Sequence, residues 1–211
     1  MKRHNVTYEN KYNDLPINTN KDKGLGCFCS FLCRYREKLE HMIKKHSKVM
    51  QVRFDLRYPG DDSVSHDKTH ISTLCEYLKR WFVRNQTGPH SADIQIEWVI
   101  DQKKSSSHPH YHVIVLVNGN AFQYAYTVLE KAEYYWGIIL KTSHGGLVDH
   151  CDKYRNSNGR SNGMMWRRGS SDAKAILEEM HYQASYLAKA RDKDGLSKGA
   201  WPRGGSRNPL K

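Results

Sequence analysis

Apolar and polar positions alternate in two segments of the chain, and a third segment carries a continuous apolar, β-branched run bounded by Asn-Gly, which is typical of a buried strand. These segments are residues 49–58, 93–101 and 110–118, and the first ends at Pro59-Gly60. A period of two residues is typical of a half-buried strand, which β-branched residues also favour. A short polar loop joins the second and third segments, so they are most simply an antiparallel hairpin.

Apolar residues at helical spacing occur between and around these strands. They predict helices over residues 27–48, 67–86, 121–141 and 172–192, and residues 145–151 suit a short further strand. The order β-α-β-β-α-(β)-α predicts an α+β fold. We expect an antiparallel sheet of four to five strands with helices packed on one face, in the split βαβ or ferredoxin-like arrangement, plus an N-terminal helix.

The two ends of the chain differ from the middle in composition. Residues 1–48 are predicted to form a basic N-terminal arm and helix, residues 49–195 the main domain, and residues 196–211 a disordered basic tail. The N-terminal part could be an extension that grips DNA, or its helix could pack on the main domain.

Charge indicates the kind of partner. Lys and Arg total 34 against 22 Asp and Glu, a formal net charge of +12. A polyphosphate partner is the simplest explanation, because each phosphate contact releases counterions.

No apolar run reaches the ~20 residues of a membrane span, and no signal peptide opens the chain, so we expect a cytoplasmic protein without a membrane partner. The five cysteines lack the paired C-x2-C spacing of zinc sites.

Two histidines in the third strand segment suggest a metal site. His110 and His112 project from the same face of a strand, about 6–7 Å apart along it, so both imidazoles can reach one ion. A metal held by two imidazoles usually takes a carboxylate as well. Asp101 and Glu97 share one face of the partner strand. Asp101 is nearer the turn and is the favoured third ligand, while Glu97 is the alternative.

A tyrosine in the last predicted helix is a candidate nucleophile. Tyr186 and Lys189 are three residues apart and share a helix face. A tyrosine oxygen can attack phosphorus and hold the resulting ester once a nearby cation activates it. Tyr182 lies one turn earlier and is a possible second participant.

Together, the strand at 52–57 (V-R-F-D-L-R), the H-Y-H motif at 110–112 and the Y-L-A-K motif at 186–189 resemble the HUH endonuclease superfamily. Within that superfamily they are most similar to the rolling-circle replication initiators of filamentous phages (inoviruses) and prophages. The resemblance covers residues 49–193.

The resemblance implies a single-tyrosine, site-specific DNA endonuclease and ligase. His110, His112 and an acidic residue would hold Mg²⁺ or Mn²⁺ at the scissile phosphate of single-stranded or hairpin origin DNA. Tyr186 would attack, leaving a 5′-phosphotyrosine and a 3′-hydroxyl that primes synthesis, with Lys189 stabilising charge. The chain has no G-x4-GK[ST] motif, so helicase and polymerase would come from the host.

Two other functions fit parts of the sequence. His108, His110 and His112 also match the alternating triad of histidine-triad nucleotidyl hydrolases, although Pro109 fits poorly inside a central strand. A non-catalytic DNA-binding regulator on the same fold is the second alternative.

The tyrosine motif also differs from that of some phage initiators. These have a second tyrosine four residues after the first, and Ala190 occupies that position here.

Overall fold

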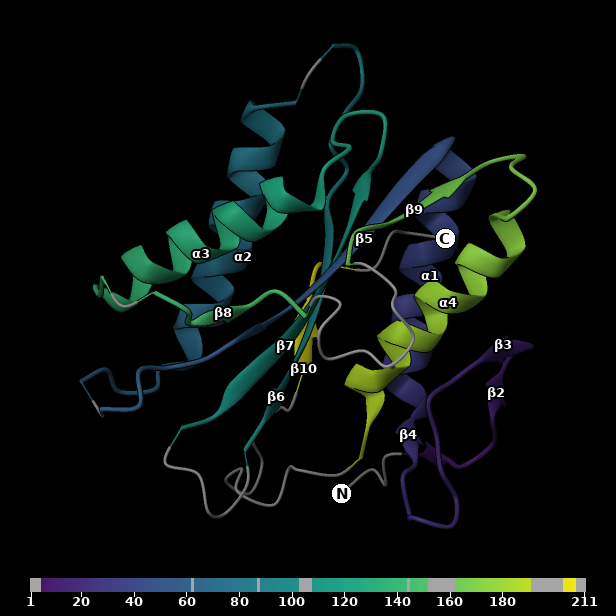
Figure 1. Ribbon diagram of the computed structural model, residues 1–211, viewed down its shortest axis with the longest axis horizontal. Coiled ribbons are helices and arrows are strands. Elements are labelled where there is room, and N and C mark those ends of the chain that lie inside the picture. The colour runs from purple at the N-terminus through teal and green to yellow at the C-terminus, as the bar shows by residue number, and fades with distance from the viewer. Residues whose placement is uncertain are drawn as a thin grey trace.

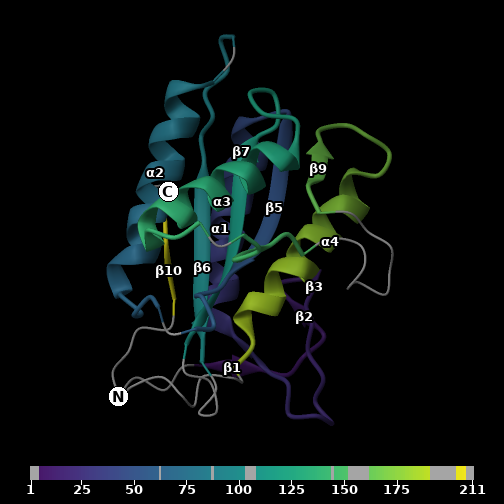
Figure 2. The ribbon, with the colours of Figure 1, turned by 60° about the vertical axis from the view of Figure 1, so that its left-hand side comes forward.

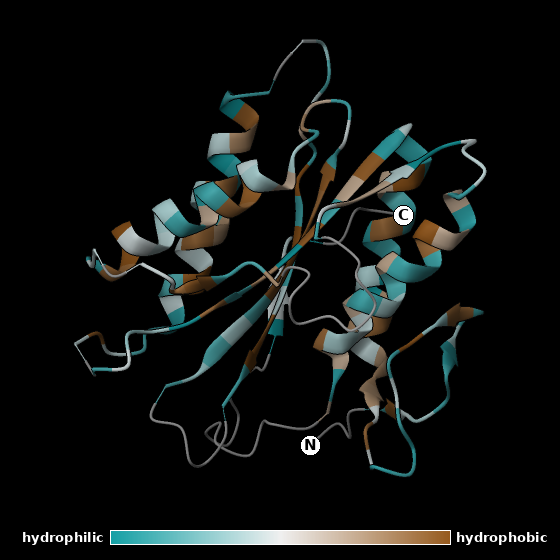
Figure 3. Ribbon diagram, viewed as in Figure 1, coloured by the Kyte–Doolittle hydropathy of each residue, from teal (hydrophilic) through white to brown (hydrophobic). Residues whose placement is uncertain are grey.

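This computed structural model describes seven segments of the chain: residues 5–61, 63–86, 88–102, 108–143, 145–151, 162–190 and 203–207. They form a mixed α+β structure, in which a central antiparallel sheet lies between two layers of helices (Figure 1). Figure 3 shows hydrophobic residues along the middle of the strands, between the helix layers.

The central sheet has six strands, compared with the four to five predicted, in the order β10-β6-β7-β5-β8, with β9 also paired to β5. Figure 2 shows β10, β6, β7 and β5 side by side in this order. The strand bounds are Lys48–Leu56 for β5, Gln95–Asp101 for β6, His110–Asn118 for β7, Val148–Asp149 for β8, Met164–Arg167 for β9 and Arg203–Gly205 for β10. The order β6-β7-β5-β8, with a helix after β5 and another after β7, is the predicted split βαβ arrangement.

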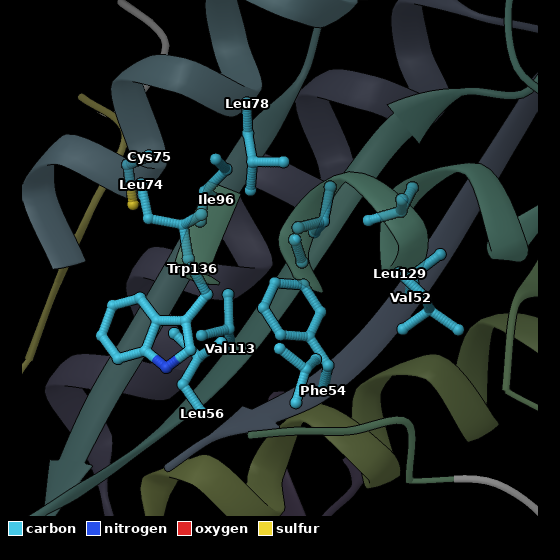
Figure 4. Packing of buried hydrophobic residues seen from close by; sticks show 14 of the residues in the cluster. Val52, Phe54, Leu56, Leu74, Cys75, Leu78, Ile96, Val113, Leu129 and Trp136 are labelled. Atoms are coloured by element: carbon cyan, nitrogen blue, oxygen red, sulfur yellow. The ribbon is translucent and has the colours of Figure 1, made fainter. Parts of the chain in front are cut away.

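Helices α2 (Lys68–Arg84) and α3 (Ala125–Leu140) cover one face of this sheet. Asp67 caps α2, because its side chain accepts a hydrogen bond from the Thr69 backbone N–H at 2.7 Å. The apolar sides of both helices pack on alternate strand residues, and Phe54 and Trp136 lie at the centre of this core (Figure 4).

Helices α1 (Cys29–Lys45) and α4 (Ala173–Ser185) cover the opposite face, which corrects the prediction of helices on one face only (Figure 1). The physical reason lies in β7, which is buried along both faces from Tyr111 onward. A strand that is apolar on both faces needs a helix layer on each side. The alternative in which the N-terminal helix packs on the main domain therefore describes α1.

The segments on either side of the predicted main domain also form structure. Four short strands precede α1: β1 Val6–Thr7, β2 Lys11–Tyr12, β3 Leu15–Pro16 and β4 Cys27–Phe28. Residues 5–28 form what we call the N-terminal strap. Ile17 of the strap is only 2% exposed, because it packs into the core under α1 and α4. The predicted basic N-terminal arm is thus an extended segment that packs on the sheet domain.

Part of the predicted disordered tail is the edge strand β10. Its residues pair with β6 from Val99 to Glu97. A Cβ on Gly204 would lie 2.4 Å from the Trp98 ring, so the strand can approach only with glycine there. Residues 191–202 and 208–211 lie outside the described segments. Within those segments, no helix has both the length and the apolar character needed to cross a bilayer.

Candidate metal centre

Three side chains that the sequence predicts to be metal ligands lie together at one end of the β6–β7 ladder. Asp101 is opposite His110 in the register, and His112 projects from the same face of β7. Each residue offers a ligand atom, and these atoms lie within 4.8 Å of one another. Asp101 and His112 are buried, and His110 is half-buried. This cluster could hold a metal ion, although its donor set does not identify which one.

A second carboxylate lies beside His112. Asp55 on β5 is opposite His112 in the register, and its Oδ1 lies 2.7 Å from His112 Nδ1. On the other side of the ring, Asp101 Oδ2 lies 3.2 Å from Nε2. Metal-binding histidines commonly donate their second ring N–H to a carboxylate, which fixes the tautomer. Asp55 thus lies on the Nδ1 side of His112, where such a carboxylate is expected, and Nε2 faces Asp101 in the cluster.

The electrostatics of the site follow from burial and close charges. Burial alone would lower the pKa of His112, but the nearby Asp101 and Asp55 carboxylates outweigh it and raise that pKa. Burial and the neighbouring His112 lower the pKa of His110. Burial would raise the pKa of Asp55, but His112 and Arg53 lower it below its usual value. The cluster thus combines one histidine that is easily deprotonated with a second held between two acids.

Tyr186 lies against this cluster. Its ring centroid is 5.6 Å from that of His112, with the two rings nearly perpendicular. The Lys189 ammonium lies 3.7 Å from the tyrosine ring centroid, and the Arg53 guanidinium lies 4.2 Å from it. The α-helix ends at Ser185, earlier than the predicted 172–192, and Tyr186–Ala188 form a 3₁₀ turn. The turn still brings the Lys189 side chain back over Tyr186, as the helical spacing had suggested.

The N-terminal strap holds this turn in place. The Asn18 backbone N–H donates to Ser185 Oγ at 2.7 Å, and the Ala190 N–H donates to the Gly26 carbonyl at 3.0 Å. Cys27 and Lys189 form an isolated antiparallel bridge. Because contacts lie on both sides of Tyr186, the strap fixes the position of its backbone relative to the sheet.

The comparisons with known proteins support one family assignment. A family model described as the YagK/YfjJ C-terminal domain matches residues 7–199. The chain belongs to the YagK/YfjJ C-terminal domain family. No curated protein and no solved structure matches the chain. The YagK/YfjJ match begins within the N-terminal strap, well before the predicted start of the main domain at residue 49. The strap and α1 are therefore part of the domain that this family shares.

Glu97, the alternative third ligand, is not part of the cluster in this YagK/YfjJ domain. It shares a face with Asp101, as predicted, but it is opposite Ile114, further into the sheet. There its Oε1 lies 2.5 Å from Lys38 Nζ and 3.1 Å from Arg34 Nη2. Glu97 and Lys38 are both almost completely buried, so Glu97 belongs to an internal ion pair.

The other candidate residues, Tyr182 and His108, lie outside the cluster. Tyr182 is 38% exposed, one turn before the 3₁₀ turn that contains Tyr186. The His108 ring stacks on Tyr58 with centroids 5.9 Å apart, and Tyr58 belongs to the core under α2 and α3. His108 therefore does not share a face with His110 and His112, contrary to what a histidine-triad hydrolase would require.

Sequence reasoning missed Arg53 and Asp55. Both lie on the face of β5 that α1 and α4 cover, and the signal was available in the alternation R-F-D-L-R, where every second residue of a central strand is charged. Charged residues in such a strand usually have a partner or a function. The strand register, which places Asp55 opposite His112, could not be obtained from the sequence.

Proposed function

We propose that this protein nicks and rejoins DNA in a metal-dependent reaction through a 5′-phosphotyrosine intermediate, and so initiates rolling-circle replication of a phage or plasmid. The observation that supports this most is the contact between Tyr186 and His112, at 5.6 Å between ring centroids. Tyr186 and the cluster of Asp101, His110 and His112 come from distant parts of the chain and lie side by side. This is the arrangement that the resemblance to HUH endonucleases implies.

The cluster of Asp101, His110 and His112 would hold Mg²⁺ or Mn²⁺. Two imidazoles and one carboxylate would supply the ligands, and Asp55 would be the carboxylate beside a ligating histidine that such sites commonly have. When bound, the ion supplies Lewis-acid polarisation of the scissile phosphate.

The chain's own residues perform the remaining steps. The Tyr186 oxygen attacks phosphorus and becomes esterified to the 5′ side, while the 3′-oxygen leaves and ends as a hydroxyl. The Lys189 ammonium beside the tyrosine ring stabilises the negative charge that develops there. Because the phosphotyrosine conserves the energy of the ester, a 3′-hydroxyl can reverse the reaction and rejoin the strand.

The net charge of +12 supports a nucleic-acid substrate. The proposed partners are single-stranded or hairpin origin DNA and a host helicase and polymerase. A non-catalytic DNA-binding regulator is the alternative that the test must distinguish.

The test is a covalent-adduct assay. Protein is mixed with Mn²⁺ and a labelled pool of single-stranded oligonucleotides of randomised sequence, and the products are run on an SDS gel. The proposal predicts an SDS-resistant adduct with wild type and none with Tyr186→Phe. Tyr182→Phe is the matched control, because it removes a hydroxyl from the same helix region and should keep the adduct.

Two results would contradict this function. An adduct that persists in Tyr186→Phe would exclude Tyr186 as the nucleophile. DNA binding without any adduct, in wild type and variants alike, would support the regulator.

A further inference from the structure

Arg53 is a charged side chain in the site for which the proposed reaction has no role so far. It lies on β5, two residues before Asp55, and its side chain is 12% exposed. Its guanidinium is 4.2 Å from the Tyr186 ring centroid. The guanidinium places a positive charge beside the candidate nucleophile.

The ion pair with Asp55 does not account for this guanidinium. Arg53 Nη2 is 3.5 Å from Asp55 Oδ1, and the same oxygen is already 2.7 Å from His112 Nδ1. Within the described segments, the buried Nε of Arg53 has no hydrogen-bond partner. A buried donor without a partner costs free energy unless a ligand satisfies it, so the group is suited to an incoming anion.

The backbone of Arg53 lies in the part of β5 between the residues that pair with β9 and those that pair with β8. β9 pairs with β5 from Lys48 to Gln51, and β8 pairs with it at Asp55 and Leu56. Between them, the Arg53 N–H donates to Asn162 Oδ1 at 3.0 Å, and Asn162 Nδ2 donates to the Arg53 carbonyl. The side chain of Asn162 thus takes the place of a strand, and Arg53 extends from a rigid position.

The charges around the site also favour the binding of a phosphate. Among the described residues, Arg53 and Lys189 place positive charge beside Tyr186, and this charge offsets that of the Asp55 and Asp101 carboxylates. The charge of a bound divalent ion is then free to attract an anionic substrate. Lys189 acts as a compact point charge, whereas the planar fork of Arg53 can bind two oxygens of one phosphate.

From this geometry we propose that Arg53 is a catalytic residue, whose guanidinium leaves the face of Tyr186 and binds the non-bridging oxygens of the scissile phosphodiester. This inference rests on the proposed function for its reaction step. In that step a bond forms between the Tyr186 oxygen and phosphorus, and the bond from phosphorus to the 3′-oxygen breaks. The phenolic proton ends on the 3′-hydroxyl, and Arg53 neutralises charge that accumulates on the non-bridging oxygens.

The first experiment measures phosphate binding without chemistry. Dimethyl phosphate is titrated into Mn²⁺-loaded protein, and binding is followed by phosphorus NMR relaxation. We expect Arg53→Gln to weaken binding about 10- to 100-fold, the loss of a charged hydrogen bond, and Arg53→Lys to weaken it less. Mn²⁺ affinity, measured by calorimetry, should stay unchanged, which would show that the cluster is intact. Arg80→Gln is the matched control, because Arg80 is an exposed arginine of α2 paired with Glu76.

Equal dimethyl phosphate binding by wild type and Arg53→Gln, or no binding by wild type, would overturn the role of Arg53.

The adduct assay then separates this inference from the proposed function. Arg53→Gln should slow adduct formation about 10²- to 10³-fold, with partial recovery in Arg53→Lys. A normal adduct rate in Arg53→Gln would overturn the inference and leave the nuclease function standing. Loss of phosphate binding in Arg53→Gln, with no adduct in wild type, would support a phosphate site and contradict the nuclease function.

Discussion

The two faces of the central sheet differ most where β5 and β7 lie side by side. On the face under α2 and α3, Phe54 and Val113 are opposite each other and are buried in an apolar core (Figure 4). On the face under α1 and α4, the next pair along the ladder is Asp55 and His112, with 2.7 Å between their side chains. One step along the ladder separates a pair that stabilises the fold from a pair in the candidate site.

Two carboxylates on the face under α1 and α4, those of Glu97 and Asp101, also have different surroundings. Glu97 is satisfied by Lys38 and Arg34, deep in the structure. Asp101, on the same strand and face, lies at the sheet end beside two imidazoles. Buried charges inside this face thus pair with each other, whereas those at its end are arranged to accept a cation. The predictions below test these divisions.

The largest effect is expected for Phe54→Ala. Removal of a fully buried ring should lower the free energy of unfolding by about 3–5 kcal/mol, measured by urea denaturation. The Mn²⁺ affinity of the folded protein should change little, because Phe54 faces away from the cluster. A large loss of metal affinity with unchanged stability would contradict the division between the faces.

A similar loss is expected for Glu97→Gln, since it leaves the buried Lys38 ammonium without its carboxylate. Breaking a buried ion pair typically costs about 3–5 kcal/mol of stability. Asp101→Asn is the matched change on the same strand, and it should instead lower Mn²⁺ affinity with a small effect on unfolding. If both variants behaved alike in calorimetry and denaturation, the two carboxylates would not have separate roles.

Asp55→Asn should have an intermediate effect on the metal site. Loss of the carboxylate that orients His112 should lower Mn²⁺ affinity about 10- to 100-fold, as for other outer-shell partners. Asp149→Asn serves as a control, because Asp149 is opposite Asp55 on β8 and contacts Arg57. Equal affinities for wild type and Asp55→Asn would show that Asp55 does not orient the ligand.

The smallest effect concerns an ion pair far from the cluster. Burial would raise the pKa of Asp93, but hydrogen bonds from Lys45 and His46 outweigh it and lower that pKa. A pKa depressed in the folded state stabilises the protein above the unfolded value near pH 4 and loses this effect as the pH falls. Asp93→Asn should therefore cost about 1 kcal/mol at neutral pH, and the difference from wild type should shrink as the pH falls through the depressed pKa of Asp93. A difference that persists in acid would contradict this assignment.

Periodicity in the sequence predicted the elements that have strong patterns. The ranges 49–58, 67–86 and 93–101 correspond to β5, α2 and β6 within a few residues. The short strand at 145–151 corresponds to β8. The alternation of the strands also placed His110 and His112 correctly on one face, because a fixed period of two residues sets that relation.

What the sequence could not predict depends on tertiary contacts. β10 contains no strand-forming residue and exists because Gly204 can approach Trp98. The sequence analysis predicts no element over residues 164–167, and β9 forms there because it pairs with an edge of β5. The choice of Asp101 over Glu97 followed from its distance to the turn, but the presence of Asp55 beside His112 depends on a register that no local pattern encodes.

The most direct measurement is the site of DNA attachment. Adducts formed with Mn²⁺ are digested with nuclease and trypsin, and the peptide 175–189, which contains both Tyr182 and Tyr186, is fragmented in a mass spectrometer. The account predicts a nucleotide joined through phosphate to Tyr186. A nucleotide on Tyr182, on a histidine, or on no residue would contradict it.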